Sequence, residues 1–249
     1  MSSHDKYWDR EQVKRLSGGY VASKKRHDTI ALYIKRNSST SNSKPKVLNI
    51  GVGNGYLEEV LIAAGYDVFC LDPSESAIAK IGDKLGIGKE SCRVGGVESI
   101  PFDSGSFDFV VMSEVIEHLE DDVLHKGLEE VRRVLRESGT LLGTVPCNED
   151  LTRETFRCPS CMQSFHRVGH VTSYLPKDMK DLLSRYFSIL VCHRFLGMHL
   201  NWKGYLLHQW NDFPFKFVRL IRPNVRAPHQ IEFNIFFAAR KVSAAWPSK

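Results

Sequence analysis

An apolar segment that runs directly into closely spaced glycines is the feature that most constrains how this chain folds. Residues 47–50 read Val-Leu-Asn-Ile, and residues 51–55 follow as Gly-Val-Gly-Asn-Gly before a segment with helical spacing. Glycines at alternate positions tolerate a positive φ and let a ligand approach the backbone closely. The N-terminus of the following helix offers unpaired N–H groups to an anionic group. The pattern therefore predicts a strand, a tight turn and a helix that together bind a nucleotide-like ligand.

Beyond the turn, short apolar runs alternate with segments of helical spacing. The expected strands are 47–50, 66–71, 107–112 and 140–145, and the expected helices are 56–64, 75–84 and 123–135. This alternation is typical of a parallel sheet with helices on both faces. Residues 187–193 and 230–240 add two strand-like runs with less helix between them. A length of 249 residues suits one large α/β domain better than two.

A polar segment marks the boundary of this domain. Residues 37–46 consist of Asn, Ser, Thr, Lys and Pro and contain nothing to bury. Such a composition is typical of a flexible linker. We therefore expect an N-terminal helical segment with a serine-rich linker at residues 1–44, and a ligand-binding domain at residues 45–249.

Tyr56 and Asp72 narrow the nature of the ligand. A dinucleotide-binding turn requires glycine or alanine at its sixth position, which is Tyr56 here. The G-x-x-x-x-G-K-[ST] pattern of a phosphate-binding loop is also absent from the sequence. Asp72 ends the next expected strand, where its carboxylate can accept hydrogen bonds from both hydroxyls of a ribose. The alternative role for Asp72 is to cap the helix that follows.

Further motifs follow in order along the chain. Residues 71–74 read Leu-Asp-Pro-Ser, 97–102 read Val-Glu-Ser-Ile-Pro-Phe, 107–119 read Phe-Asp-Phe-Val-Val-Met-Ser-Glu-Val-Ile-Glu-His-Leu, 131–135 read Val-Arg-Arg-Val-Leu and 138–142 read Ser-Gly-Thr-Leu-Leu. With the glycine turn, residues 45–146 resemble the class I S-adenosylmethionine (SAM)-dependent methyltransferases, in particular the branch typified by the ubiquinone-biosynthesis methyltransferases. The resemblance implies an α/β, Rossmann-like fold: a mostly parallel seven-stranded sheet with helices on both faces and an antiparallel last strand.

The resemblance also implies which residues bind SAM. These are Asn49, Gly51, Gly53, Gly55, Asp72, Val97, Ser113 and Glu114. The three glycines would lie under the methionine part of SAM, and Asp72 would hold the ribose. The Val97 N–H would meet the adenine, while Ser113 and Glu114 would face the sulfonium.

Two positions depart from the family. It usually has an acid where this chain has Asn49, and often has one where this chain has Gly96. Both departures predict weaker SAM binding. In related enzymes the N-terminal region closes over bound SAM, so the resemblance implies that residues 1–44 contain a lid.

The spacing C-x2-C-x4-H-x3-H places four metal-type side chains close together in the sequence. They are Cys158, Cys161, His166 and His170. Two thiolates and two imidazoles form a common tetrahedral zinc set, and a site closed by four protein ligands indicates a structural ion. Cys147 is the substitute ligand if one histidine is not used, while a redox pair or an active-site role for the histidines are the alternatives. The insertion at residues 147–174 resembles a zinc knuckle of some bacterial methyltransferases of this branch.

Methyl transfer from a sulfonium requires alignment, exclusion of water and, for an oxygen acceptor, removal of a proton. His118 is the candidate base, with a structural histidine bonded to a neighbour as the alternative. Residues 197–229 are the expected acceptor-recognition insertion. Its aromatic and basic residues are Trp202, Tyr205, Trp210, Phe213, Phe215, Phe217, Lys203, Lys216, Arg219, Arg222 and Arg226. Aromatic rings stack on sugars and bases and arginines suit phosphate, although a lid that only covers the core has the same pattern.

We therefore predict an O-methyltransferase for a small molecule or for a nucleotide- or lipid-linked sugar. The Asn/Asp-Pro-Pro-Tyr/Phe motif of amino-group methyltransferases is absent, since residues 113–116 read Ser-Glu-Val-Ile. A tRNA or protein methyltransferase and a non-catalytic SAM-binding scaffold are the alternatives, and the basic residues also allow contact with nucleic acid or a membrane surface. The polar N-terminus and the lack of a run of roughly 18 apolar residues predict a cytoplasmic protein without a transmembrane segment.

Overall fold

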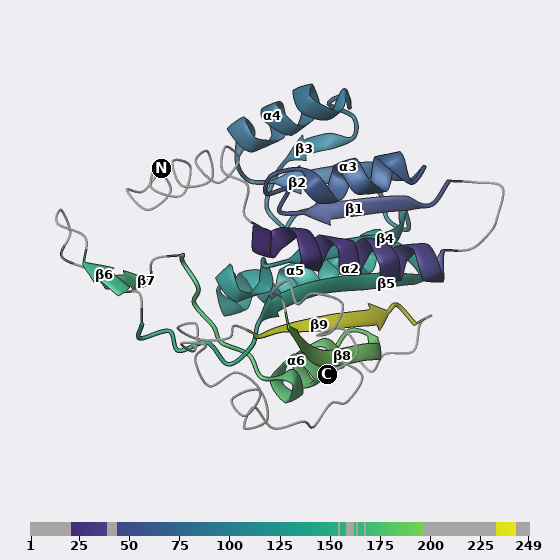
Figure 1. Cartoon of the computed structure of the whole chain (residues 1–249). Coiled ribbons are helices and arrows are strands. Elements are labelled where there is room, and N and C mark those ends of the chain that lie inside the picture. The colour runs from purple at the N-terminus through teal and green to yellow at the C-terminus, as the bar shows by residue number, and fades with distance from the viewer. Residues whose placement is uncertain are drawn as a thin grey trace, which may run out of the picture.

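Seven strands form one mixed sheet in the computed structural model, which describes residues 21–38, 44–153, 155–157, 162, 164–166, 168–196 and 233–242 (Figure 1). The strands are β1 Lys46–Ile50, β2 Asp67–Asp72, β3 Cys92–Val94, β4 Phe107–Ser113, β5 Leu135–Pro146, β8 Ser188–Leu196 and β9 Phe233–Arg240. Their order across the sheet is β3-β2-β1-β4-β5-β9-β8. The strand order reverses between β1 and β4, and sheets of this type bind ligands outside the carboxyl ends of the strands at that point.

The last strand of the sequence is the antiparallel one. β1 pairs in parallel with β2 and β4, and β4 pairs in parallel with β5. β9 instead runs antiparallel to both β5 and β8, between which it is inserted. This arrangement, together with helices on both faces, confirms the fold class expected from the sequence.

Helices cover the two faces of the sheet. α2 Val21–Asn37, α3 Tyr56–Ala63 and α4 Glu75–Leu85 pack on one face, and α5 Asp121–Val134 and α6 Pro176–Leu183 pack on the other. α5 buries Leu124, Leu128 and Val131, whose spacing places them on one side of a helix. On the opposite face, Ile30 and Ile34 are fully buried and anchor α2 to the sheet.

Two elements of the main sheet and its covering helices were not expected from the sequence. β3 has only three residues, which is too short for an alternating apolar pattern to be recognised. α6 begins at Pro176, and the Asp178 carboxylate accepts a hydrogen bond from the Leu175 N–H at 2.9 Å. Proline in the first turn followed by an acid is a helix-start signal that the sequence analysis missed.

The segment between β5 and α6 contains a short hairpin. Its strands, β6 Thr155–Arg157 and β7 Ser164–His166, form a separate two-stranded sheet that lies away from the main sheet in Figure 1. This hairpin falls within the insertion expected at residues 147–174. Among the helices that the structure describes, none is both long and apolar enough to span a membrane.

Candidate functional site

The glycine turn joins β1 to α3 at the carboxyl end of the sheet. Gly51, Gly53 and Gly55 have φ values of 82°, 52° and 77°, a region that L side chains rarely adopt. A Cβ on Gly55 would collide with the Ile81 side chain, so the turn packs directly against α4. The Gly51 N–H donates to the Leu71 carbonyl at 2.9 Å, which ties the turn to β2. The predicted turn is therefore a backbone cradle next to the end of β2.

Asp72 ends β2 beside this turn and is 2% exposed. Its Oδ2 accepts a hydrogen bond from the Val52 N–H at 3.1 Å, and its Oδ1 accepts one from the Ser74 N–H at 2.9 Å. The N-cap of α4 is Ser74, whose Oγ accepts a hydrogen bond from the Ala77 N–H at 3.3 Å. Asp72 therefore links the glycine turn to the start of α4, and the capping role that competed for it belongs to Ser74.

A buried carboxyl group stands behind the turn, next to the position where related enzymes carry an acid. The Asn49 amide donates to Glu58 Oε1 at 2.7 Å, and its nitrogen lies 3.5 Å from the Gly51 carbonyl oxygen. Glu58 comes from the first turn of α3, and both side chains are buried. Burial raises the pKa of Glu58 from 4.5 to about 7, although the Asn49 hydrogen bond acts in the opposite direction. Helix α3 thus supplies the carboxyl group that β1 lacks.

We expect the free energy of unfolding to decrease as the pH rises from about 4.5 to about 7, because Glu58 ionises first in the unfolded chain. The stabilising contribution is complete below the lower pKa and lost above the higher one, a difference on the order of 3 kcal/mol. Glu58→Gln should remove this dependence, measured by urea denaturation across the same pH range. Its exposed neighbour provides the control, since Glu59→Gln should keep the wild-type profile. Identical profiles for the wild type and Glu58→Gln would contradict the assignment.

Gly96 is the second departure from the family, and a neighbouring side chain fills the space beside it. A Cβ on Gly96 would collide with the carboxylate of Glu98. Glu98 therefore places its carboxylate in the space that the side chain of an acid at position 96 would begin to fill. Val97 between them is buried and packs close to Gly127 of α5, where an added Cβ would lie 2.9 Å from Val97 Cγ1. A carboxyl group therefore lies next to both positions that depart from the family, from Glu58 at Asn49 and from Glu98 at Gly96.

A polar network closes the carboxyl end of β4. Thr144 Oγ1 lies 2.8 Å from Ser113 Oγ and donates to Glu114 Oε1 at 2.9 Å. The Asn234 amide donates to the same oxygen at 3.0 Å, and Arg26 Nε lies 3.8 Å from it. Glu114 has a φ of 58°, and such uncommon backbone conformations cluster at functional sites. Side chains from β5, β9 and α2 therefore hold Glu114 in place.

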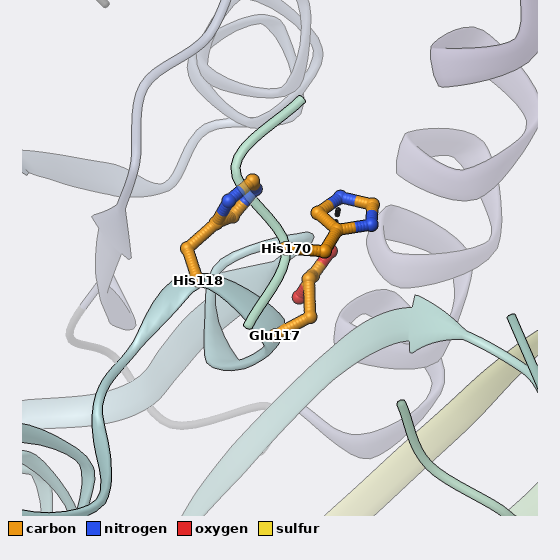
Figure 2. A group of neighbouring side chains, drawn as sticks. All are labelled: Glu117, His118 and His170. Atoms are coloured by element: carbon orange, nitrogen blue, oxygen red, sulfur yellow. Dashed lines mark ion pairs between the residues drawn. The ribbon is translucent and has the colours of Figure 1, made fainter. Parts of the chain in front are cut away.

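Glu117, His118 and His170 meet directly after β4 (Figure 2). Glu117 and His118 belong to the 3-10 helix η1 Ile116–His118, and His170 comes from the loop after β7. Glu117 Oε1 lies 3.9 Å from His170 Nε2, and the rings of the two histidines have centroids 4.7 Å apart. Burial and the nearby Glu114 raise the pKa of Glu117 well above its usual value. The Val171 N–H donates to the Glu117 carbonyl at 2.8 Å, which ties the loop to η1.

Glu149 extends this group toward the hairpin. One of its carboxylate oxygens is hydrogen-bonded to His170 Nδ1, and the other lies 3.9 Å from His166 Nε2. These histidine contacts hold the pKa of Glu149 below its usual value, although burial acts in the opposite direction. Two of the four predicted zinc ligands thus share a carboxylate that the sequence analysis did not consider.

The other predicted zinc ligands are placed differently. Cys158 and Cys161 lie outside the described residues, so the set of two cysteines and two histidines stays a prediction. Cys147, the substitute ligand, is half-buried, and its backbone N–H donates to the Phe233 carbonyl at 2.8 Å. Its thiol interacts with Arg194, and burial raises its pKa. Among the described residues, Cys147 belongs to neither group of side chains that could hold a metal ion.

The methyltransferase-domain family matches residues 48–143, which include the glycine turn, Asp72 and the end of β4. This match covers 96 of the 249 residues. The chain is 28% identical over 159 residues to a ubiquinone/menaquinone biosynthesis C-methyltransferase of Citrifermentans bemidjiense, covering 58% of this chain and 66% of the relative. A probable SAM-dependent methyltransferase of Mycobacterium tuberculosis is 31% identical over 100 residues, covering 40% of this chain and 35% of that protein. The alignments therefore span less than two thirds of these relatives.

Solved structures of other proteins have the same fold as this chain. A 1,6-didemethyltoxoflavin-N1-methyltransferase of Burkholderia thailandensis, with bound 1,6-didemethyltoxoflavin and S-adenosylhomocysteine, superposes with a TM-score of 0.60 at 13% identity, over 97% of this chain and 92% of that chain. A putative methyltransferase of Bacillus halodurans superposes with a TM-score of 0.57 at 16% identity, over 86% of this chain and 100% of that chain. At these identities the likeness shows the fold. With the sequence relatives, it supports a domain of the class I SAM-dependent methyltransferases.

Sequence reasoning missed several polar residues of this site. They are Arg26, Glu58, Glu98, Thr144, Glu149 and Asn234. One signal was available for Glu58, since it lies on α3 between Leu57 and Leu61, which are both buried. A carboxyl group at a position that helical spacing places toward the core is uncommon unless it has a partner. For Asn234, 120 residues after Glu114, no local signal exists, because only sheet pairing brings β9 beside β5.

Proposed function

We propose that this chain transfers the methyl group of SAM to an oxygen atom of a small-molecule or sugar acceptor. The observation that carries the proposal is the meeting of three features in one methyltransferase domain: the glycine cradle, the buried Asp72 carboxylate and the polar network around Glu114. All three lie at the carboxyl ends of β1, β2 and β4, where a sheet with this strand order binds ligands.

The residues present fit SAM. The positive φ values of the glycine turn keep side chains out of the cradle, so the backbone can approach the methionine part. Asp72 is oriented by two backbone N–H groups, and its carboxylate oxygens have further lone pairs for ribose hydroxyls. Val97 would meet the adenine, and Ser113 and Glu114 would lie near the sulfonium. Asn49 and Gly96 predicted weaker SAM binding because each replaces an acid. The carboxyl groups of Glu58 and Glu98 lie next to these two positions, which favours retained SAM binding.

The acceptor side requires alignment and a base. SAM, when bound, supplies a methyl carbon whose bond to sulfur breaks as the acceptor oxygen attacks, so that S-adenosylhomocysteine leaves with the electron pair. The acceptor hydroxyl must then give its proton to the protein or to water. His118 is the predicted base, and its Nδ1 lies 3.1 Å from the Gly169 carbonyl oxygen, so the proton resides on Nδ1 and Nε2 is the basic atom. Glu149 and His170 lie in the same group and provide further proton acceptors.

The start of α2 supports the proposed lid. The Tyr56 hydroxyl, directly after the glycine turn, donates to Asp28 Oδ1 at 2.7 Å. The rings of His27 and Tyr56 are stacked with centroids 6.1 Å apart, and burial lowers the pKa of His27 to about 4. The first half of α2 thus contacts the helix that follows the glycine turn. We propose that the rest of residues 1–44 continues over SAM; residues 1–20 and 39–43 lie outside the described part of the chain.

Two further parts of the proposal concern segments outside the described residues. The aromatic and basic insertion at 197–229 would recognise the acceptor, and Cys158 and Cys161 would contribute to a structural zinc site. Metal analysis of the purified chain and of the Cys158→Ser/Cys161→Ser variant tests the zinc site. The cytoplasmic location stays a prediction.

We expect the purified chain to bind SAM and to transfer its methyl group. Isothermal titration calorimetry should give saturable SAM binding, and labelled SAM should transfer label into the small-molecule or glycan fraction of a cell extract. Absence of SAM binding would contradict both enzymatic interpretations. Binding without transfer to any fraction would favour the non-catalytic scaffold. Label in RNA, together with nucleic-acid binding that falls steeply with salt, would favour a tRNA methyltransferase.

A further inference from the structure

Two histidines and a buried carboxylate beside the Glu114 network form a set of metal-type donors. One ligand atom from each of Glu117, His118 and His170 lies within 4.8 Å of the others. Glu117 and His118 are fixed by η1 directly after β4, and two hydrogen bonds to the Glu117 carbonyl fix the loop that carries His170. The three side chains converge from two elements in Figure 2. Two imidazoles and one carboxylate are a ligand set that zinc and iron enzymes use when some coordination positions stay open.

Outer contacts orient both histidines for this role. His118 Nδ1 faces the Gly169 carbonyl at 3.1 Å, so Nδ1 carries the proton and Nε2 is the ligating nitrogen. His170 Nδ1 is hydrogen-bonded to Glu149, and its Nε2 lies 3.9 Å from Glu117 Oε1. A ligating histidine almost always donates its other N–H to a carboxylate or to a backbone carbonyl. Here the partner is a backbone carbonyl at His118 and a carboxylate at His170.

The Glu117 carboxylate points independently to a cationic ligand. Its side chain is 1% exposed, and within the described part of the chain neither carboxylate oxygen has a hydrogen-bond partner. Burial of an unpartnered carboxyl group is costly, and native proteins compensate for it with a partner charge or a metal ion. Glu114 and Glu149 add further negative charge nearby. Arg26, whose Nε lies 3.8 Å from Glu114 Oε1, acts against this charge and lowers the pKa of Glu117.

We propose that Glu117, His118 and His170 bind a divalent first-row transition-metal ion, with Glu149 as the outer partner of His170. The protein ligands would leave coordination positions open, as in catalytic metal sites. The site adjoins the Glu114 network, so an acceptor oxygen bound there would be close to the proposed position of the sulfonium. A Lewis acid at this place lowers the pKa of an acceptor hydroxyl, the task that His118 would otherwise perform as a base.

This site differs from the predicted zinc knuckle in both ligands and role. The knuckle is a closed set with two thiolates, whereas the new site contains only nitrogen and oxygen donors. His170 is common to the two sets. Its assignment here leaves Cys158, Cys161 and His166 as knuckle donors, with Cys147 as the substitute fourth ligand. Binding of the ion does not depend on methyl transfer, while its role in activating an acceptor rests on the proposed function.

Cobalt(II) titration of the chelator-treated full chain, without SAM, tests the site. We expect a visible d–d absorption of the nitrogen- and oxygen-ligand type that persists in the Cys158→Ser/Cys161→Ser variant. Glu117→Gln and His118→Gln should weaken this binding by more than the roughly 10- to 100-fold that loss of an outer partner causes, and Glu149→Gln should fall within that range. Glu129→Gln and His125→Gln, which change the same residue types on α5, serve as matched controls and should bind as the wild type does.

The outcome of the titration separates this proposal from the others. Retention of wild-type cobalt affinity and absorption in both Glu117→Gln and His118→Gln would overturn it, whatever the cysteine variant does. X-ray absorption at the cobalt edge of the Cys158→Ser/Cys161→Ser variant provides a second measurement that needs neither substitution. Scattering from imidazole rings supports the site, and its absence argues against it. Because SAM is omitted, failure of SAM binding in calorimetry would leave this result unaffected.

Discussion

Replacement of Asp72 by asparagine should weaken SAM binding by about 100-fold or more, because a charge-assisted hydrogen bond contributes roughly 1.5–3 kcal/mol and Asp72 would make two to the ribose. The substitution also places an amide NH2 where the carboxylate now accepts the Val52 and Ser74 N–H groups at 3.1 Å and 2.9 Å. One of these buried donors would then face another donor. The glycine turn would lose its link to α4, and the cradle would be less well ordered before SAM arrives. Isothermal titration calorimetry measures the change.

The control for this variant is Asp67→Asn, at the opposite end of the same strand, β2. Asp67 lies far along the strand from the glycine turn, so SAM affinity should not change. Thermal unfolding of both variants shows whether the fold is intact. If folded Asp72→Asn binds SAM as tightly as the wild type, Asp72 has only a structural role at the turn.

Gly143→Ala should destabilise the fold by about 3 kcal/mol or more, since overpacking against an immobile neighbour leaves no room for relaxation. Gly143 lies on β5 opposite Met112 of β4, at the centre of the parallel part of the sheet. An added Cβ would overlap the Met112 carbonyl oxygen, which is backbone and cannot rotate away, and it would also lie 2.8 Å from the Phe237 ring of β9. Three adjacent strands would have to separate. Urea denaturation should show a much lower midpoint, with loss of SAM binding at moderate urea.

Gly88→Ala provides the matched change at an open position, since an added Cβ there would meet nothing within 4 Å. We expect its free energy of unfolding to differ from that of the wild type by less than about 0.5 kcal/mol. A Gly143→Ala variant as stable as Gly88→Ala would show that β4 and β5 can move apart without loss of packing, contrary to the close contact described above.

The cofactor half of the site follows from local sequence. Gly51, Gly53 and Gly55 directly follow a strand-like run, and Asp72 ends the next one, so a parallel sheet must bring them to the same edge. The helix expected at 123–135 occupies 121–134 in the structure, because its apolar residues recur at helical spacing. The spacing of the apolar residues and the order of the expected strands and helices were enough to predict the fold class.

The sequence indicated Ser113, Glu114 and His118 on the acceptor side, but the contacts that hold them did not follow from it. Glu114 is held by Arg26, Thr144 and Asn234, which come from three elements far apart along the chain. His166 and His170 were interpreted as knuckle ligands because of their spacing to Cys158 and Cys161. The structure also places His170 against Glu117, which lies 53 residues earlier in the chain. Spacing reports only neighbours in the chain. Contacts between η1 and the loop after β7 depend on how that loop returns across the sheet.

The sequence by itself determined the fold class, the glycine turn and the position of Asp72, because each rests on backbone preference or on the period of apolar residues. Only the tertiary structure decided that Glu58 and Glu98 bring carboxyl groups to the places where the family's acids are missing. It also decided that Glu117, which is buried and has no side-chain hydrogen bond among the described residues, faces His118 and His170. A buried charge must find its partner in space, and the order of residues along a chain does not specify that partner.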